Sequence, residues 1–175
     1  MTDATLFPLS EKQIAIIRKK TTECITKANK HYKLKLQPLD IHFDVHGTSW
    51  GYFVRKNGHC LLRYNPTLFA RHFREGLEDT IPHEVAHYVV DQRFQRRRKP
   101  HGVEWREVMR LFGIENPRAT HQTPLDGLDI RRQRRYVYYC GCGETRLSAT
   151  RHNRIVYKGA RYFCRKCKQP LSPEK

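Results

Sequence analysis

No stretch of this sequence approaches the ~18 consecutive apolar residues that a membrane-spanning helix needs. The first ten residues have neither the basic start nor the apolar run of a signal peptide. The chain also shows no internal repeat and no low-complexity segment. We therefore expect a globular protein of the reducing cytoplasm, with no membrane as a partner.

Acidic side chains are half as numerous as basic ones, with 17 Asp and Glu against 34 Lys and Arg, so the formal net charge is +17. Residues 131–175 carry 13 Lys and Arg against two Glu, or +11, whereas residues 1–130 carry 21 against 15, or +6. Such asymmetry indicates that the C-terminal end faces nucleic acid. The length suits one domain with a small appendage, and we place the boundary at residue 130, after an aperiodic segment that contains Pro124 and Gly127.

The most informative motif is His83-Glu84-Val85-Ala86-His87. Residues four apart share one face of an α-helix, so His83 and His87 can bind the same metal ion. Three protein ligands and one open position make a catalytic zinc site. Glu84 lies beside the two histidines, where its carboxylate can take a proton from water at the metal. The motif predicts a metal-dependent enzyme with Glu84 as its catalytic residue.

The alternative is an ordinary helix with two surface histidines flanking a glutamate. Helical spacing of four apolar residues favours the metal site, because it predicts a helix packed on a core: Ile81, Val85, Tyr88 and Val89. Pro82 then lies either in the first turn, after a Thr80 cap, or within a longer helix that begins upstream.

A third ligand is needed, and His101 in Pro100-His101-Gly102 is the best candidate. It precedes a short amphipathic helix that ends at Gly113 and carries Trp105, Val108, Met109 and Phe112. If this helix packs its apolar face against the helix of the motif, its N-terminal end brings His101 to the metal. Glu104 is the rival, since carboxylates also bind zinc.

Two close pairs of cysteines predict a second metal site, Cys140 with Cys142 and Cys164 with Cys167. Such spacing is typical of a structural zinc ribbon, in which four thiolates leave no place for water. This second zinc is expected to fold residues 131–175 and to do no chemistry. Between the pairs we expect two strands, at 147–150 and 154–157.

Disulfides are the alternative for these four cysteines, but nothing in the sequence indicates secretion. Cys24 falls on the apolar face of a predicted helix and Cys60 in a predicted strand, so both are expected to be small buried residues. The sequence thus predicts two Zn²⁺ ions, one catalytic and one structural.

Basic and aromatic residues alternate through the C-terminal segment. Phosphates attract cations and unstacked bases pack on flat rings, so the mixture favours single-stranded or distorted DNA. The alternative is that the tyrosines fill a small core and the arginines only solubilise it. Nine cations are expected to contact nucleic acid: Arg131, Arg132, Arg134, Arg135, Arg151, Arg154, Arg161, Arg165 and Lys166. A further run, Arg96-Arg97-Arg98-Lys99, is either a solvated loop or draws a DNA-bound substrate towards the metal.

The remaining patterns predict an α+β domain. Ser10-Glu11-Lys12-Gln13 is a capping box before an amphipathic helix. Three strands follow, at 34–45, 50–55 and 60–64, with Asn57-Gly58 as a hairpin turn, and Asn65-Pro66 begins another helix. The order of one helix, three strands and three helices predicts a metal-binding helix packed on a small sheet.

These motifs resemble the SprT-like family, and within it the compact bacterial SprT proteins. The resemblance rests on residues 81–87 (IPHEVAH), 100–105 (PHGVEW), Thr120-His121-Gln122 and Arg151-His152-Asn153, and it covers nearly the whole chain. It implies a zincin-like metallopeptidase domain over 1–130, with His83, His87 and His101 as zinc ligands and Glu84 as the catalytic residue. A four-cysteine zinc ribbon over 131–175 completes the expected architecture.

The resemblance also implies a role like that of the Spartan proteases, eukaryotic relatives that cut proteins trapped covalently on DNA and depend on DNA. We expect a monomer that acts on protein substrates held on DNA and is nucleoid-associated when bound there. Two other functions stay open: a nucleic-acid-binding regulatory module with an idle metal site, and a metallopeptidase of soluble proteins.

Overall fold

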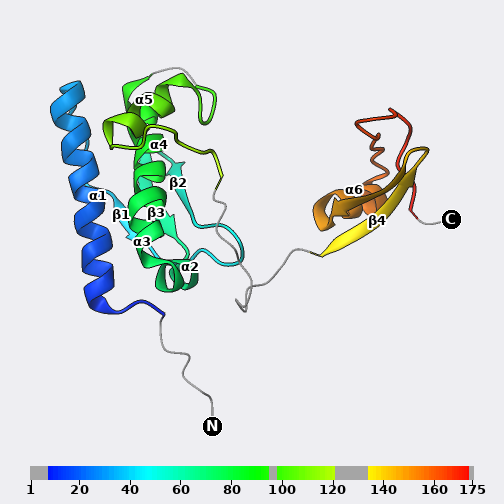
Figure 1. Cartoon of the computed structure of the whole chain (residues 1–175), viewed down its shortest axis with the longest axis horizontal. Helices are drawn as coiled ribbons and strands as arrows, with labels where there is room; N and C mark the ends of the chain where they lie inside the picture. The colour runs from blue at the N-terminus through cyan, green and yellow to red at the C-terminus, as the bar shows by residue number, and fades with distance from the viewer. Residues whose placement is uncertain (1–7, 95–97, 121–133, 174–175) are drawn as a thin grey trace, which may run out of the picture. The chain divides into compact units, whose positions relative to one another are not determined.

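The computed structural model describes residues 8–94, 98–120 and 134–173 (Figure 1). The chain divides into two units, Met1–Ile130 and Arg131–Lys175, and each is described by itself. The first unit has mixed α and β structure, in the predicted order of a helix, a three-stranded sheet and further helices.

The N-terminal helix α1 (Glu11–Tyr32) begins with the predicted capping box. The backbone N–H of Gln13 donates to Ser10 Oγ at 3.2 Å, and the N–H of Ser10 donates to Gln13 Oε1 at 2.9 Å. The predicted apolar stripe is also confirmed, because the buried residues of α1 are Ile17, Thr21, Cys24, Ile25 and Ala28. This stripe packs on α4 (Ile81–Arg93), which runs beside α1 in Figure 1.

The sheet contains β1 (Asp40–His42), β2 (Gly51–Lys56) and β3 (His59–Tyr64), in the spatial order β1-β3-β2. Strand β1 is parallel to β3, and β2 is antiparallel to it. The predicted hairpin turn is confirmed: Asn57 and Gly58 have φ values of 51° and 81°, as a two-residue type I′ turn requires. Strand β2 therefore forms one edge of the sheet.

The register of this hairpin decides which backbone groups of β2 form no hydrogen bond to β3. The pair that flanks a two-residue turn, Lys56 with His59, exchanges hydrogen bonds, and so does every second pair along the ladder. The intervening residues Gly51, Phe53 and Arg55 turn their N–H and C=O groups away from β3, towards the open edge.

The long strand predicted at 34–45 is wrong, since β1 spans only Asp40–His42. The Asn29 side chain holds the preceding backbone, accepting from the N–H of Leu36 at 2.8 Å and donating to its carbonyl at 3.1 Å. Pro38 has no N–H to offer a ladder. The segment before β1 is therefore bound to α1 instead of to the sheet.

Helices α2 (Pro66–Arg71), α3 (Phe73–Glu75) and the π-helical turn η1 (Gly76–Thr80) lead into α4. Pro82 lies in the first turn of α4, as one of the two predictions has it, but Thr80 makes no side-chain cap: its φ and ψ of −68° and −45° are helical, so α4 continues directly from η1. The missing N–H of Pro82 falls directly after the π-helical turn, in which Ile81 N–H bonds to the carbonyl five residues back.

Helix α5 (Val103–Leu111) follows the predicted pattern, burying Trp105, Val108 and Met109 and packing against α4. Gly113, with φ of 97°, ends this segment. Together α1, α4, α5 and one face of the sheet enclose a continuous apolar core. No helix in the part of the chain that the structure describes is long and apolar enough to cross a membrane.

The second unit contains an antiparallel hairpin, β4 (Arg135–Cys140) and β5 (Gly143–Ser148), followed by helix α6 (Ala149–Lys158). The two strands predicted at 147–150 and 154–157 are therefore wrong. Ser148 Oγ caps the helix by accepting from the N–H of Arg151, and Gly159 ends it in the left-handed conformation. Strand-forming residues in 155–157 misled the prediction, because packing against the hairpin outweighs their local preference.

Candidate metal centres and active site

The three histidines predicted as ligands converge at one point. His83 and His87 lie one turn apart on α4, and His101 lies in the loop before α5. The Nε2 atom of His101 is 3.0 Å from Nε2 of His83 and 3.1 Å from Nε2 of His87. Two helices that pack through their apolar faces thus place three imidazole nitrogens around a common position.

Hydrogen bonding among the rings does not account for this geometry. An imidazole nitrogen carries either one proton or one in-plane lone pair, so Nε2 of His101 cannot bond to both neighbouring nitrogens at once. Tetrahedral zinc with Zn–N bonds of ~2.0–2.1 Å would separate its nitrogen ligands by about 3.3 Å, close to what is found. The donor set and its spacing therefore fit a zinc ion, with one tetrahedral position left for water or substrate.

The loop before α5 aims His101 at the other two histidines. His101 itself has a left-handed φ of 55°, uncommon for a residue other than glycine. The next residue, Gly102, donates its N–H to the carbonyl of Lys99 at 3.0 Å. A Cβ on Gly102 would lie 2.9 Å from that same carbonyl oxygen, so the turn requires glycine there. The rival ligand Glu104 pairs instead with Arg98, at 3.4 Å.

Trp105 packs against all three histidines. The centroid of its ring system lies 4.7 Å from that of His83, 4.8 Å from His101 and 5.8 Å from His87. Its Nε1–H donates to the backbone carbonyl of His83 at 3.3 Å. Trp105 is only 1% exposed, so the core holds the indole, and the indole holds the imidazoles in place.

Burial favours the neutral form of two of these imidazoles, those of His87 and His101. Burial lowers the pKa of His87 to about 4, and the neighbouring His101 lowers it further. Burial also lowers the pKa of His101, with a smaller contribution from Arg106. Because only a neutral imidazole can bind metal, both rings are ready to act as ligands near pH 7.

Glu84 lies between the histidines and the open edge of the sheet. Its side chain is buried, and Oε2 accepts a hydrogen bond from the backbone N–H of Phe53 in β2 at 2.7 Å. A cavity of about 560 Å³ opens over this arrangement. Its lining combines the three histidines and Glu84 with Thr48, Ser49, Trp50, Gly51, Tyr52, Phe53, Pro100, Ala119 and Thr120.

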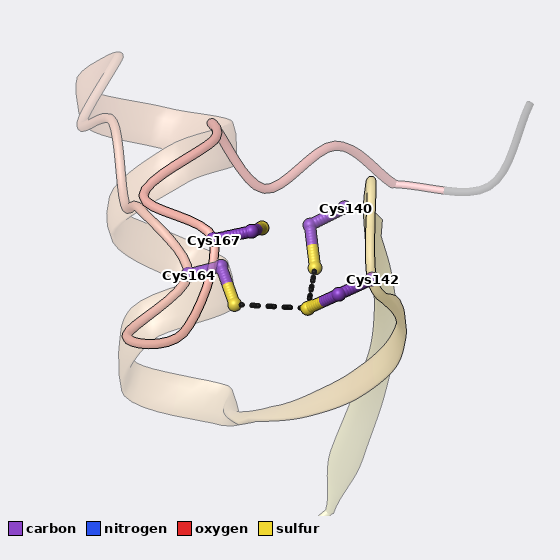
Figure 2. Close-up of side chains that lie close together, drawn as sticks. All are labelled: Cys140, Cys142, Cys164 and Cys167. Atoms are coloured by element: carbon purple, nitrogen blue, oxygen red, sulfur yellow. Dashed lines mark hydrogen bonds between the residues drawn. The ribbon is translucent and has the colours of Figure 1, made fainter.

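The four cysteines of the second unit also converge (Figure 2). Cys140 ends β4, Cys142 lies in the β4–β5 turn, and Cys164 and Cys167 lie in the segment after α6. Sγ of Cys142 lies 3.4 Å from Sγ of Cys140 and 3.5 Å from Sγ of Cys164. These separations far exceed a disulfide bond of ~2.05 Å and approach the ~3.8 Å expected for tetrahedral zinc thiolates, so four thiolates fit a structural zinc ion.

Backbone donors favour the thiolate form at one side of this cluster. The N–H groups of Cys167 and Lys166 point at the Cys164 sulfur and lower its pKa to about 6. The pKa of Cys142 is raised to about 12, because its proton is shared with the sulfurs of Cys140, Cys164 and Cys167. Cys24 is buried, with its pKa raised to about 11 by that burial, and neither Cys24 nor the half-buried Cys60 belongs to the cluster.

The predicted nucleic-acid residues that the structure describes are all exposed on the second unit: Arg134, Arg135, Arg151, Arg154, Arg161, Arg165 and Lys166. Arg151, Arg165 and Lys166, together with Arg146, line a groove of about 370 Å³ beside the cysteines. The aromatic side chains of Tyr162 and Phe163 line the same groove. Arg131 and Arg132 lie outside the described residues, as do Arg96, Arg97 and His121.

His152 belongs to one of the motifs that resemble the SprT-like family, but no role could be derived for it from the sequence. In the structure it connects α6 to β4. Its ring stacks on Tyr136 with centroids 3.6 Å apart and planes 5° apart. Its Nδ1 is hydrogen-bonded to the Tyr138 hydroxyl at 3.1 Å. Both contacts lie within the second unit, so the residue has a structural role there.

Sequence reasoning missed two parts of the site. The strand over 50–55 was predicted, but the pattern does not say which strand forms the edge, so the Phe53 N–H was not foreseen as a partner of Glu84. Trp105 was assigned to the apolar face of its helix without its contacts to the histidines. These contacts could have been suspected, because Trp105 lies only four residues after His101 in the sequence.

Comparison with known proteins agrees with this arrangement. A model of the SprT-like family matches residues 21–124, which include every histidine of the site. "Protein SprT" of Vibrio parahaemolyticus is 38% identical over 152 residues, covering 86% of this chain and 87% of the relative. "Protein SprT" of Pasteurella multocida is 34% identical over 156 residues, covering 89% and 90%. No solved structure gives a significant match. The chain belongs to the SprT-like family.

Proposed function

We propose that this protein is a zinc-dependent endopeptidase of zincin-like fold, and that its C-terminal unit binds DNA. Its substrates would be proteins bound or crosslinked to DNA. The observation that carries the proposal is the convergence of three imidazole nitrogens beside Glu84, at an open sheet edge. Membership of the SprT-like family supports the same activity.

The open edge of β2 offers a way to hold a peptide substrate. Gly51, Phe53 and Arg55 direct backbone groups away from β3, and the cavity beside the histidines runs along the first two of them. The Phe53 N–H donates to Glu84, so the Phe53 carbonyl and the backbone groups of Gly51 and Arg55 would receive the peptide. An extended peptide that added a strand here would be held by its main chain, largely regardless of its sequence. Its scissile carbonyl would then lie next to Glu84 and the three histidines.

The chemistry follows from the groups around that carbonyl. His83, His87 and His101 would hold a zinc ion, which would act as a Lewis acid by lowering the pKa of water towards ~7 and polarising the carbonyl. The Phe53 N–H holds Oε2 of Glu84, which leaves Oε1 to receive the proton of the attacking water. Glu84 then delivers this proton to the leaving amine nitrogen. Each histidine ring is held in place by its contact with Trp105.

DNA binding is proposed for the second unit because of its charge and its groove. Residues 131–175 carry +11, and the groove beside the cysteines combines four cations with two aromatic rings. Cations neutralise phosphates and rings stack on unpaired bases, so single-stranded DNA suits this lining. Binding should weaken with salt by about 0.7 log units per log unit of salt for each phosphate contacted.

The deciding experiment is cleavage of a DNA-binding protein by the zinc-loaded enzyme, with and without single-stranded DNA. Glu84→Gln removes the proton acceptor with little change in shape, and Glu23→Gln, on the exposed face of α1, is the matched control. We expect cleavage that needs Glu84 and increases with DNA, and no effect of the control.

Other outcomes would support the rival functions. Cleavage that needs Glu84 but ignores DNA would indicate a metallopeptidase of soluble proteins. DNA binding without cleavage by either protein would indicate a nucleic-acid-binding module with an idle metal site. A flat response of DNA binding between low and moderate salt would remove the electrostatic part of the proposal.

A further inference from the structure

The histidine site opens on a second side. A cavity of about 360 Å³ lies against His87 and His101 and shares Phe53, His87, Pro100 and His101 with the larger cavity. The two cavities therefore flank the metal position, one towards Gly51 and the other towards Arg55 along β2. A peptide laid along this edge would place side chains into both.

The two cavities differ in charge. Among the described residues, the lining of the larger cavity contains no lysine or arginine, whereas that of the second has Arg55, Arg98 and Lys99 against one acid, Asp91. Arg55 pairs with Asp91 at 3.0 Å, and Arg98 pairs with Glu104 at 3.4 Å. Lys99 forms no ion pair with any of the described residues, so the second cavity keeps an unneutralised cation.

Apolar side chains share the lining of the second cavity with these charged groups. Val90, Phe94 and Trp105 form its body, and the Arg98 guanidinium lies 4.7 Å from the centre of the Phe94 ring. An apolar body with a cationic rim fits a side chain with a short aliphatic stem and a terminal carboxylate. A phosphate group has no apolar part to place against these walls, so the lining suits a peptide better than a nucleic-acid backbone.

We propose that this cavity is a specificity subsite that selects glutamate or aspartate next to the scissile bond. The inference rests on the proposed peptidase function and names its substrate class. Residues of an extended peptide are ~3.4 Å apart, so a side chain in a cavity that shares two of the proposed zinc ligands lies within one or two residues of the cleaved bond. Residues on the other flank would be uncharged, to match the larger cavity.

The test uses matched peptides in which Glu, Gln or Lys stands in turn at each of three positions on either side of the cleaved bond. At one position, Glu should raise kcat/KM over Gln by about twofold to fivefold, the upper part of the range expected of an exposed charge pair. Lys99→Glu should abolish that ratio and favour the Lys peptide. Lys56→Glu is the control, because Lys56 is exposed at the end of β2 and lines neither cavity. This variant should keep the preference for Glu over Gln.

Binding of the same peptides to zinc-loaded Glu84→Gln, followed by fluorescence anisotropy, gives a readout free of catalysis. The Glu peptide should bind more tightly than the Gln peptide, and the difference should shrink from low to moderate salt. Arg55→Gln should reduce the difference as a second variant.

Equal use and equal binding of Glu and Gln peptides would overturn the subsite. The subsite would also be overturned if Lys99→Glu lost affinity for single-stranded DNA but kept the preference for Glu. The cations of the second cavity would then bind DNA and not the peptide. If no peptide is cleaved, the proposed function fails, while the anisotropy series still decides whether the cavity selects acidic side chains.

Discussion

The histidine centre and the cysteine centre differ in whether a hydrophobic core surrounds the candidate metal site. The three histidines lie on elements that already enclose a large apolar core, including Trp105 and most of the fully buried side chains. In the described part of the second unit, only Tyr138 and Leu147 are buried hydrophobic residues. In the first unit the core positions the candidate metal site, whereas in the second a bound metal would take the place of a core.

The largest effect is expected from Cys164→Ser in the second unit. Loss of one thiolate should release the structural zinc, and the ~10–16 kcal/mol that such a site contributes would then be missing from folding. Residues 134–173 should unfold, while residues 8–120 keep their structure. Hydrogen exchange measured by mass spectrometry on the zinc-loaded protein would show both.

His101→Ala is the matched change at the other centre. It should remove zinc from the histidine site and leave exchange in α1, α4 and the sheet unchanged, because their core does not depend on the metal. Unfolding of the first unit in this variant would contradict the contrast between the two centres, and so would a folded second unit after Cys164→Ser.

A smaller effect is expected from Trp105→Phe, which tests how the core supports the histidine site. The change removes the Nε1–H bond to the His83 carbonyl and part of the surface against which the three rings pack. Loss of a group that orients metal ligands typically weakens metal affinity by about tenfold to a hundredfold. Chelator competition would measure this, with the cysteine centre of the same molecule as an internal control that should not change.

The structure of the first unit was predicted better from the sequence than that of the second, and the difference in hydrophobic core explains why. In the first unit, α1, the β2–β3 hairpin and α5 were foreseen, because capping residues, turn residues and apolar periodicity agree there. In the second, α6 was mistaken for two strands, because 155–157 favour strands locally and few apolar positions show a period. The cysteine pairs were still recognisable, since ligand spacing does not depend on the elements that carry it. Contacts made by main-chain groups, such as that from Phe53 to Glu84, leave no mark in the sequence.

The two centres should also differ in how zinc affinity depends on pH. His87, with its pKa lowered to about 4, has no proton to lose between pH 6.5 and 8.5, so binding there should change little. Cys142, with its pKa raised to about 12, must release a proton on binding throughout this range. Affinity at the cysteine centre should therefore rise by about tenfold per pH unit from this residue alone. Chelator competition at several pH values checks the prediction, and equal slopes for the two centres would contradict it.

The smallest effect comes from the two serine caps, one in each unit. Ser10→Ala and Ser148→Ala each remove a side-chain acceptor at a helix N-terminus, a loss of ~1 kcal/mol in either helix. In the first unit this should lower the free energy of unfolding whether or not zinc is bound, as denaturant titration would show. In the second unit folding and zinc binding are one process, so the same loss should weaken zinc affinity at the cysteine centre by about fivefold. If Ser148→Ala left that affinity unchanged, α6 would have to be folded before the metal binds, and the second unit would possess a core of its own.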